Sequence, residues 1–457
     1  MGSQLLPVAY SFRIPSLHDS TPLDCRIHHP ASLVDLDLDS GTEWTRKVAI
    51  LAHPYAVLGG GFDDPIVENV GAELLVQGYV VGTFNFRGAH NSSGRTSWTG
   101  KPELADYMSF AGALVCYMHA LKPPGPSSTP VSQKQDVSGP PIHIVFGGYS
   151  YGSLIVTRLP PIDSLLAPFQ STPTSQAASI IHQLASSLAA RTTEELVEQH
   201  EASKKQQYLS PTNPRSTFEI RRKSPVTIGG YESDAAATAG GGKRKNQDAG
   251  ANGRRSLSLD LRRPQSWGKE LRSSFQAPRH HRQHEDTATP DKDDEAPPPP
   301  LPASGRLAIS PAYLLISPLL PPLSFLIAPS LALSSLSLSL SLFSSSSPSS
   351  RSPSSNPLTT HPALVLFGAS DGFTGSKRLR AWCGKLSTES EAEADQQQAQ
   401  IDEPAAPAAP AAPPRKHSRF AWHEVEGAGH FWLEIGAMAE LRGRVKTWAE
   451  SLGNQSP

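Results

Sequence analysis

Short apolar runs alternate with longer amphipathic stretches along much of this chain. Runs of four to eight apolar residues are typical of strands buried on both faces, whereas apolar residues spaced three or four apart are typical of helices. Two strand-like segments within residues 8–30, joined by a polar turn, predict a hairpin. Six further runs predict strands at 47–53, 79–86, 141–146, 312–320, 361–368 and 419–427.

The segments between these runs carry the signals of helices. Asp64 is the expected N-cap of the first one, and Pro65 occupies its first turn. Comparable patterns predict further helices at 102–121, 151–159, 175–205, 374–386 and 431–452, of which 175–205 is a candidate cap helix. Alternating strands and helices predict an α/β fold with a mostly parallel, eight-stranded sheet covered on both faces.

Long segments of biased composition interrupt this alternation. Residues 203–304 are basic, rich in Gly, Pro and Ser, and poor in aliphatic periodicity, which predicts a disordered insertion. Residues 331–360 are a Ser/Leu-rich low-complexity segment, either disordered or a faulty part of a gene model, and 388–417 are a Pro/Ala-rich linker. A single domain is therefore expected from four pieces, at 1–202, 305–330, 361–387 and 418–457.

Charge and cysteine content exclude several classes of partner. The 41 Lys and Arg residues nearly balance the 42 Asp and Glu residues, so a nucleic acid partner is not expected. The three cysteines, Cys25, Cys116 and Cys383, are far apart and odd in number, which predicts neither a disulfide framework nor a metal site. With no signal peptide and no long apolar run, we expect a cytoplasmic protein without an integral membrane segment.

The pattern G-x-S-x-G occurs twice, so context must choose between two serines. Ser150 lies at the centre of "GYSYG", after the fifth predicted strand, and Ser370 at the centre of "GASDG", after the seventh. A serine nucleophile on a strand-to-helix turn needs an acid and a histidine later in the chain, and only Ser150 leaves room for both. Tyr151 opens the next helix, so its backbone N–H is an expected oxyanion donor.

The partners of Ser150 are predicted from the ends of the last two strands. Asp371 follows the seventh strand and is the candidate acid, with the capping of the following helix as its alternative role. His430 follows the eighth strand and is the candidate base, with a structural role at the helix start as the alternative.

These motifs, taken in order, resemble those of the α/β-hydrolase superfamily of serine hydrolases. The chain looks closest to a largely uncharacterised branch, similar to serine-aminopeptidase-like and esterase-like proteins, with an "HP" turn after strand three and an arginine-glycine turn after strand four. Here these turns are "AHPYAVLGGG" and "FNFRGAH". The resemblance implies that Tyr55 gives the second oxyanion N–H and that His53 shapes its loop. Arg87 is either a structural arginine or a substrate contact.

The predicted function is hydrolysis of an ester, thioester or amide through an acyl-enzyme, without a cofactor or metal. The expected partner is a small-molecule acyl substrate or a peptide. Two alternatives remain. One is a non-catalytic scaffold that binds protein partners, of unknown identity, through its disordered insertion. The other is a membrane-associated lipase that uses the apolar segment 318–329 as a lid.

Overall fold

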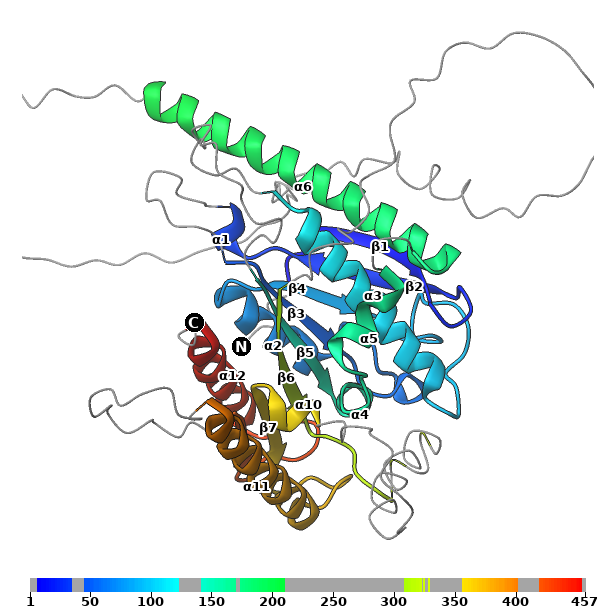
Figure 1. Ribbon diagram of the computed structural model, residues 1–457, viewed down its shortest axis with the longest axis vertical. Helices are drawn as coiled ribbons and strands as arrows, with labels where there is room; N and C mark the ends of the chain where they lie inside the picture. The colour runs from blue at the N-terminus through cyan, green and yellow to red at the C-terminus, as the bar shows by residue number, and fades with distance from the viewer. Residues whose placement is uncertain are drawn as a thin grey trace, which may run out of the picture. The chain divides into compact units, whose positions relative to one another are not determined.

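An eight-stranded sheet organises the computed structural model (Figure 1). The structure describes residues 6–34, 45–122, 141–169, 173–209, 308–322, 324, 328, 356–401 and 419–453. The strands are β1 (Tyr10–Pro15), β2 (Pro22–His28), β3 (Lys47–Ala52), β4 (Val80–Phe84), β5 (Ile142–Tyr149), β6 (Ile309–Ile316), β7 (Ala363–Gly368) and β8 (Phe420–Val425).

The spatial order of the strands is β1-β2-β4-β3-β5-β6-β7-β8. β2 is antiparallel to both of its neighbours, β1 and β4, and every later pairing is parallel. This arrangement confirms the predicted hairpin and the mostly parallel eight-stranded sheet. The carboxyl ends of the parallel strands therefore share one edge, where ligands of open α/β sheets usually bind.

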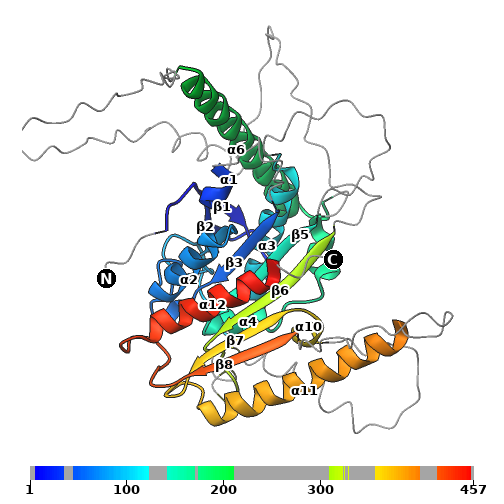
Figure 2. The ribbon, with the colours of Figure 1, turned by 90° about the vertical axis from the view of Figure 1, so that its left-hand side faces the viewer.

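Helices cover both faces of this sheet. They are α1 (Ala31–Val34), α2 (Pro65–Val76), α3 (Lys101–Ala120), α4 (Tyr151–Val156), α5 (Ile162–Leu166), α6 (Gln176–Leu209), α10 (Pro357–Thr360), α11 (Ser376–Ile401) and α12 (Ala437–Gly453), with 3₁₀ turns η1 (Ala56–Leu58) and η2 (Ala167–Phe169). Along β3, Val48 and Ile50 belong to one core cluster and Ala49 and Leu51 to the other, so the strand is buried on both faces. α2 and α12 line the second cluster, and Figure 2 shows α12 crossing in front of the strands.

Local signals predicted the start of α2 correctly, but the predicted start of α12 was wrong. The Asp64 side chain accepts a hydrogen bond from the backbone N–H of Ile66, as expected of an N-cap. α12 begins at Ala437 rather than at residue 431, because Trp432 has a φ of 55°. Its indole is buried, and Nε1 donates to Ser317 Oγ at 3.1 Å, so the tertiary contact holds a loop where helical spacing predicted a helix.

Two other boundaries differ from the prediction. α11 continues to Ile401, so the linker expected from 388 is wrong for its first part, and the Glu, Ala and Gln residues there are good helix formers. β6 ends at Ile316 rather than at residue 320, because Ser317 has a φ of 46° and Pro318 follows it. The rest of the linker, the insertion at 203–304 beyond Leu209, and most of 331–360 lie outside the described residues and stay predictions.

α6 packs on the body of the fold and is not the cap helix that was expected. Ile181, Ala185 and Leu188 of this helix belong to the core cluster that includes α3. The Tyr117 hydroxyl of α3 lies 2.9 Å from the Thr192 hydroxyl of α6. The helix therefore covers α3 and the β1 edge of the sheet, as Figure 1 also shows.

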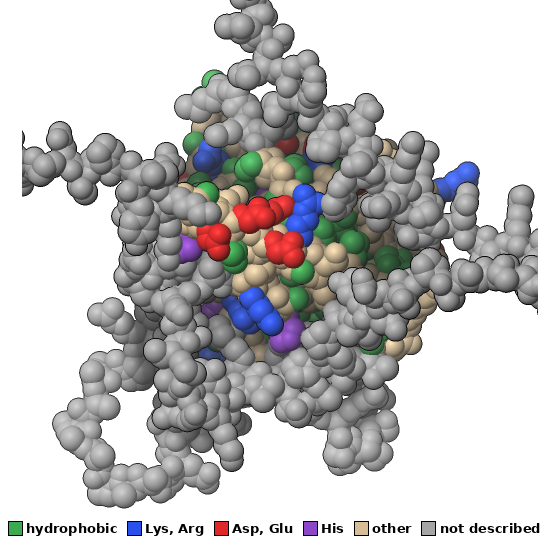
Figure 3. Space-filling model, turned by 90° about the horizontal axis from the view of Figure 1, so that it is seen from above, with side chains coloured by type: hydrophobic (Ala, Val, Ile, Leu, Met, Phe, Trp, Pro, Cys, Tyr) green, Lys and Arg blue, Asp and Glu red, His purple; other side chains and the backbone are tan. Residues whose placement is uncertain are grey.

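The surface carries charges of both signs. On the face drawn in Figure 3, acidic and basic side chains lie close to one another in the coloured part. Among the described residues, no helix is both long and apolar enough to cross a bilayer.

Arg87 lies in a buried ion-pair network directly after β4. Its guanidinium donates to both carboxylate oxygens of Asp106, at 2.9 and 2.7 Å, and also to Asp19 and Ser16. The side chains of Arg87 and Asp106 are 5% and 0% exposed. A bidentate pair of this kind fixes the loop after β4 against α3, so Arg87 has the structural role.

His53 anchors the turn that follows β3. Its Nε2 accepts a hydrogen bond from the backbone N–H of Phe86 at 2.9 Å, so Nδ1 carries the proton and donates to the carbonyl oxygen of Pro54 at 2.6 Å. The imidazole is completely buried, and burial lowers the pKa of His53 to about 4. The bond from Phe86 needs the neutral ring, because a proton on Nε2 would remove its acceptor.

Replacement of Arg87 by alanine should lower the free energy of unfolding by about 3–5 kcal/mol, because it leaves the Asp106 carboxylate buried without its partner. Arg444→Ala, which removes an exposed ion pair with Glu440, should cost less than about 0.5 kcal/mol. Urea denaturation of both variants measures the difference. Equal losses would contradict the structural role given to Arg87.

The stability contributed by neutral His53 should fall as the pH is lowered. The unfolded side chain takes up a proton below its ordinary pKa of 6.5, whereas the folded one resists until about 4, so the contribution is complete above pH 6.5 and declines toward pH 4. Between pH 7 and pH 5 the loss should be about 2 kcal/mol. Urea denaturation should show that His53→Gln flattens the pH dependence by this amount, whereas Val76→Ala on exposed α2 surface leaves it unchanged.

Candidate active site

Ser150 lies at the turn between β5 and α4. Its φ of 55° and ψ of −110° are rare for a residue with a side chain, and its backbone N–H donates to Ile316 of β6 at 2.8 Å. A side chain at Gly148 would collide with the backbone of Gly152, and one at Gly152 would collide with Ala52 of β3. The two glycines therefore permit the close approach of strand and helix that this turn requires.

A continuous chain of hydrogen bonds joins the three predicted site residues. The Nε2 atom of His430 lies 2.8 Å from Ser150 Oγ, and its Nδ1 atom lies 2.8 Å from Asp371 Oδ2. The carboxylate can only accept, so Nδ1 carries the proton and Nε2 is the acceptor for the serine hydroxyl. All three residues are at most 6% exposed. The sheet thus brings together residues that are 280 positions apart in the chain.

Asp371 has two sets of partners, one for each oxygen. Oδ1 accepts from the backbone N–H groups of Phe373 and Thr374, at 2.8 and 3.0 Å, and Oδ2 faces His430. Burial by itself would raise the pKa of Asp371, but the hydrogen bond and charge of His430 and the two backbone donors lower it. Asp371 therefore closes the turn before α11 and also bonds to the imidazole, and its role as the catalytic acid stays a prediction.

Ser370, the serine of the second motif, has a different environment. It is exposed, and its backbone N–H donates to the carbonyl oxygen of Ala428 at 2.9 Å. The second G-x-S-x-G pattern is thus the turn that carries Asp371, and the imidazole bonds to Ser150 instead.

The two tyrosines predicted to supply oxyanion donors lie next to each other. Their ring centroids are 5.1 Å apart, which brings the loop after β3 against the start of α4. Tyr151 is the first residue of α4, where a backbone N–H has no partner within the helix. Tyr55 accepts hydrogen bonds from Leu58 and Gly60 through its carbonyl oxygen, so its loop forms a tight turn.

Aromatic residues around His430 were not predicted from the sequence. The Tyr149 hydroxyl donates to the carbonyl oxygen of His430 at 3.1 Å, and the rings of Phe373 and Phe431 flank the imidazole. The available signal was the aromatic residue near each polar one, in "SDGF" and "GHFW". Aromatic residues are common next to polar ones in loops, so only the structure shows which of them contact the imidazole.

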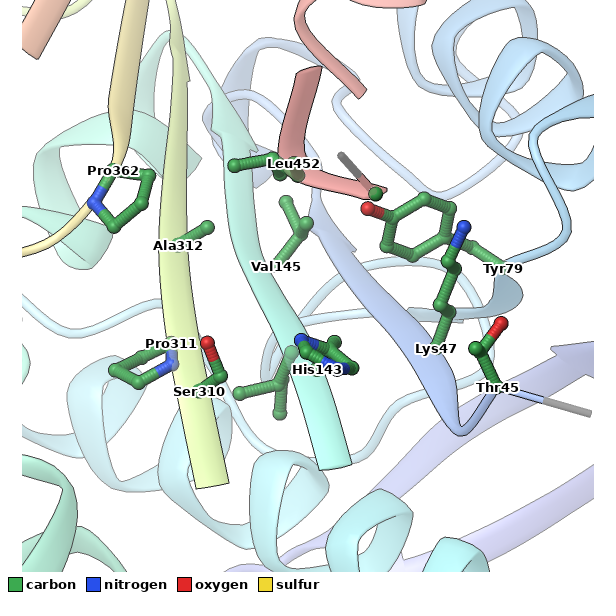
Figure 4. Close-up of a pocket in the computed structure, with 12 residues that line it drawn as sticks. Thr45, Lys47, Tyr79, His143, Val145, Ser310, Pro311, Ala312, Pro362 and Leu452 are labelled. Atoms are coloured by element: carbon green, nitrogen blue, oxygen red, sulfur yellow. The ribbon is translucent and has the colours of Figure 1, made fainter. Parts of the chain in front are cut away.

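A pocket also lies at the opposite edge of the sheet, where the parallel strands begin. Lys47, His143 and Ser310 line it, at the starts of β3, β5 and β6, and Figure 4 shows Lys47 beside Tyr79. His143 precedes Ser150 by seven residues of nearly continuous strand, or about 23 Å. This pocket is therefore separate from the hydrogen-bonded site.

Thiol chemistry does not compete with the hydroxyl of Ser150. All three cysteines are buried and free, and burial raises the pKa values of Cys116 and Cys383 to about 12. Within the described ranges, no cluster of three His, Cys, Asp or Glu side chains could hold a metal ion.

Comparisons with known proteins give structural similarity at low sequence identity. No protein-family model matches the chain, and no curated protein matches its sequence. An α/β serine hydrolase homologue from Coxiella burnetii is similar, with a TM-score of 0.37 and 11% identity, over 97% of this chain and 99% of that one. An α/β serine hydrolase without lid from Xanthomonas campestris has a TM-score of 0.40 and 11% sequence identity, over 99% of each chain. The mouse α/β hydrolase domain-containing protein 10 has a TM-score of 0.34 and 9% sequence identity, over 97% of this chain and all of that one.

The fold assignment rests on features of the chain itself. The sheet has an antiparallel hairpin edge followed by parallel strands, and a G-x-S-x-G turn joins β5 to α4. Asp371 and His430, the candidate acid and base, follow in the order of the α/β-hydrolase pattern. This chain has the fold of the α/β-hydrolase superfamily.

Proposed function

We propose that this protein is a serine hydrolase that cleaves an ester, thioester or amide through an acyl-enzyme. The observation that carries the proposal is the hydrogen-bonded chain from Asp371 through His430 to Ser150, at the turn between β5 and α4. A structural cluster would not require a strained serine with its hydroxyl directed at an imidazole whose tautomer is fixed.

Acylation begins with proton transfer to the imidazole. His430 Nε2 takes the proton from Ser150 Oγ as the oxygen attacks the carbonyl carbon, and the carbonyl electrons move to its oxygen. When the tetrahedral intermediate collapses, the bond to the leaving group breaks and the leaving group receives the proton from Nε2. Water then repeats the sequence on the acyl-enzyme, releases the acid and restores the serine.

Asp371 stabilises the charged imidazolium that forms in both steps. Its carboxylate is buried beside Nδ1, and its lowered pKa keeps it ionised at neutral pH. The backbone bonds to Oδ1 hold the carboxylate in place, so the imidazole keeps its orientation during proton transfer.

The developing oxyanion needs donors that are in place before the reaction. We assign this role to the backbone N–H groups of Tyr151 and Tyr55. The contact between their rings supports the assignment, because it holds the two loops together. His53 fixes the second loop through its bond to Pro54, which makes it a positioning residue. The nucleophile, base and donors all come from the chain, so the chemistry requires no cofactor.

A fluorophosphonate should label Ser150 and leave Ser370 unmodified. Of the two motif serines, Ser150 has its hydroxyl 2.8 Å from the imidazole of His430, whereas Ser370 is exposed and follows another strand. Mass spectrometry of the labelled peptide locates the adduct. Ser150→Ala should abolish labelling, and the matched Ser370→Ala variant should label as the parent does. Absence of any adduct in folded protein would favour the non-catalytic scaffold.

Asp371→Asn should lower kcat on a small activated ester by roughly 10³–10⁴-fold while the protein stays folded, because the amide no longer stabilises the imidazolium. Steady-state hydrolysis of phenyl acetate measures the effect, and circular dichroism checks the fold. Asp63→Asn, which removes an acid of the exposed ion pair with Arg26, should change kcat less than about 3-fold. Near-parental activity in Asp371→Asn would mean that this aspartate only closes its turn.

A further inference from the structure

Two partly exposed phenylalanines lie against the imidazole of His430. The ring centroid of Phe373 is 4.4 Å from that of His430, and the centroid of Phe431 is 5.4 Å from it. The two phenylalanine rings are 5.5 Å apart and nearly perpendicular. Their exposed fractions are 37% and 55%, so each ring contacts the imidazole and also presents an apolar surface.

The backbone bonds of this region hold both rings beside the site. The backbone N–H of Phe373 donates to Asp371 Oδ1, so its position is coupled to the acid. Phe431 lies between His430 and Trp432, whose buried indole is bonded to Ser317. Two exposed aromatic side chains are thus attached to a fixed backbone, as is expected of a binding surface formed before the ligand arrives.

The apolar surface continues along the same loop. Leu433 is 83% exposed and Ile435 is fully exposed, although both are large aliphatic residues. Between them, Glu434 directs its carboxylate back to the backbone N–H of Gly429, and this bond lowers the pKa of Glu434. Large apolar side chains that are exposed close together in the sequence favour a contact with a ligand or partner.

The mechanism determines which part of a substrate reaches these rings. After it takes the serine proton, His430 Nε2 must deliver it to the leaving-group oxygen, which therefore lies within hydrogen-bond distance of the imidazole. The Tyr55 and Tyr151 loops serve the carbonyl oxygen instead. Exposed side chains that contact the imidazole are accordingly well placed to meet the leaving group.

We infer that Phe373 and Phe431 form the binding wall for the leaving group, and that the preferred substrates are esters of apolar alcohols. This inference rests on the proposed serine hydrolase function and adds the substrate class. The two phenylalanines are specificity-determining residues, and Leu433 and Ile435 extend the wall for longer alcohols. An apolar alcohol buries its chain against the rings, whereas a charged or strongly hydrated alcohol gains no binding free energy from this contact.

The test compares acetate esters of straight-chain alcohols from methyl to octyl. These alcohols have nearly equal acidity, so chain length changes binding and leaves the chemical step almost constant. For the parent protein, kcat/KM should rise by about 2- to 4-fold for each methylene that contacts the wall. A second series, methyl esters of acids of increasing length, varies only the acyl side.

Variants of the wall should affect the first series alone. Phe373→Ala and Phe431→Ala should each reduce the octyl-to-methyl ratio of kcat/KM by at least about 5-fold, and Phe431→Leu should keep most of the ratio because it stays apolar. Val76→Ala removes an exposed aliphatic side chain from α2 and should leave both series unchanged. The half-exposed positions of the two rings make folded alanine variants practicable, and thermal unfolding verifies them.

The outcomes separate this inference from the function on which it rests. If the parent protein hydrolyses methyl acetate but shows no preference for longer alcohols, or if the alanine variants change both series equally, the leaving-group wall is wrong and the hydrolase remains. If the parent neither hydrolyses any ester nor reacts with a fluorophosphonate at Ser150, the proposed function itself is wrong.

Discussion

The His430 imidazole has to meet two partners at once, and the geometry of the sheet makes this possible. Ser150, Asp371 and His430 follow β5, β7 and β8, which end at the same edge because they run parallel. A slip of one residue in any of these pairings would turn the side chains of a whole strand to the opposite face. It would also break the two 2.8 Å hydrogen bonds of His430. The register of the core strands is therefore the physical basis of the site.

Local strain at Ser150 is balanced by bonds to the neighbouring strand. The positive φ of this residue is unfavourable, but its backbone N–H is bonded to Ile316, and the Ser153 side chain accepts from the backbone N–H of Ile316 at 2.9 Å. The neighbouring strand β6 thus stabilises the turn through hydrogen bonds to Ile316. Gly148 and Gly152 remove the side chains that would keep strand and helix apart.

Buried and exposed residues near the site have different tasks. Arg87 and His53 are buried and hydrogen-bonded to the surrounding fold, so they fix the loops after β4 and β3. Phe373 and Phe431 have rigid backbones but exposed rings, so they are available to a ligand. This division explains why a charged residue beside the site is structural, whereas apolar residues carry the inferred specificity.

The sequence alone determined the features that depend on neighbouring residues. The strands and the N-cap at Asp64 follow from short apolar runs and turn residues, and the order of motifs along the chain favours Ser150 over Ser370 as the candidate nucleophile. The start of α12 and the packing of α6 were decided by the tertiary structure, because Trp432 and Ile181 bury their side chains against residues distant in sequence. The contact of Phe373 and Phe431 around His430 also required the fold, since it joins loops that only the pairing of β7 with β8 brings together.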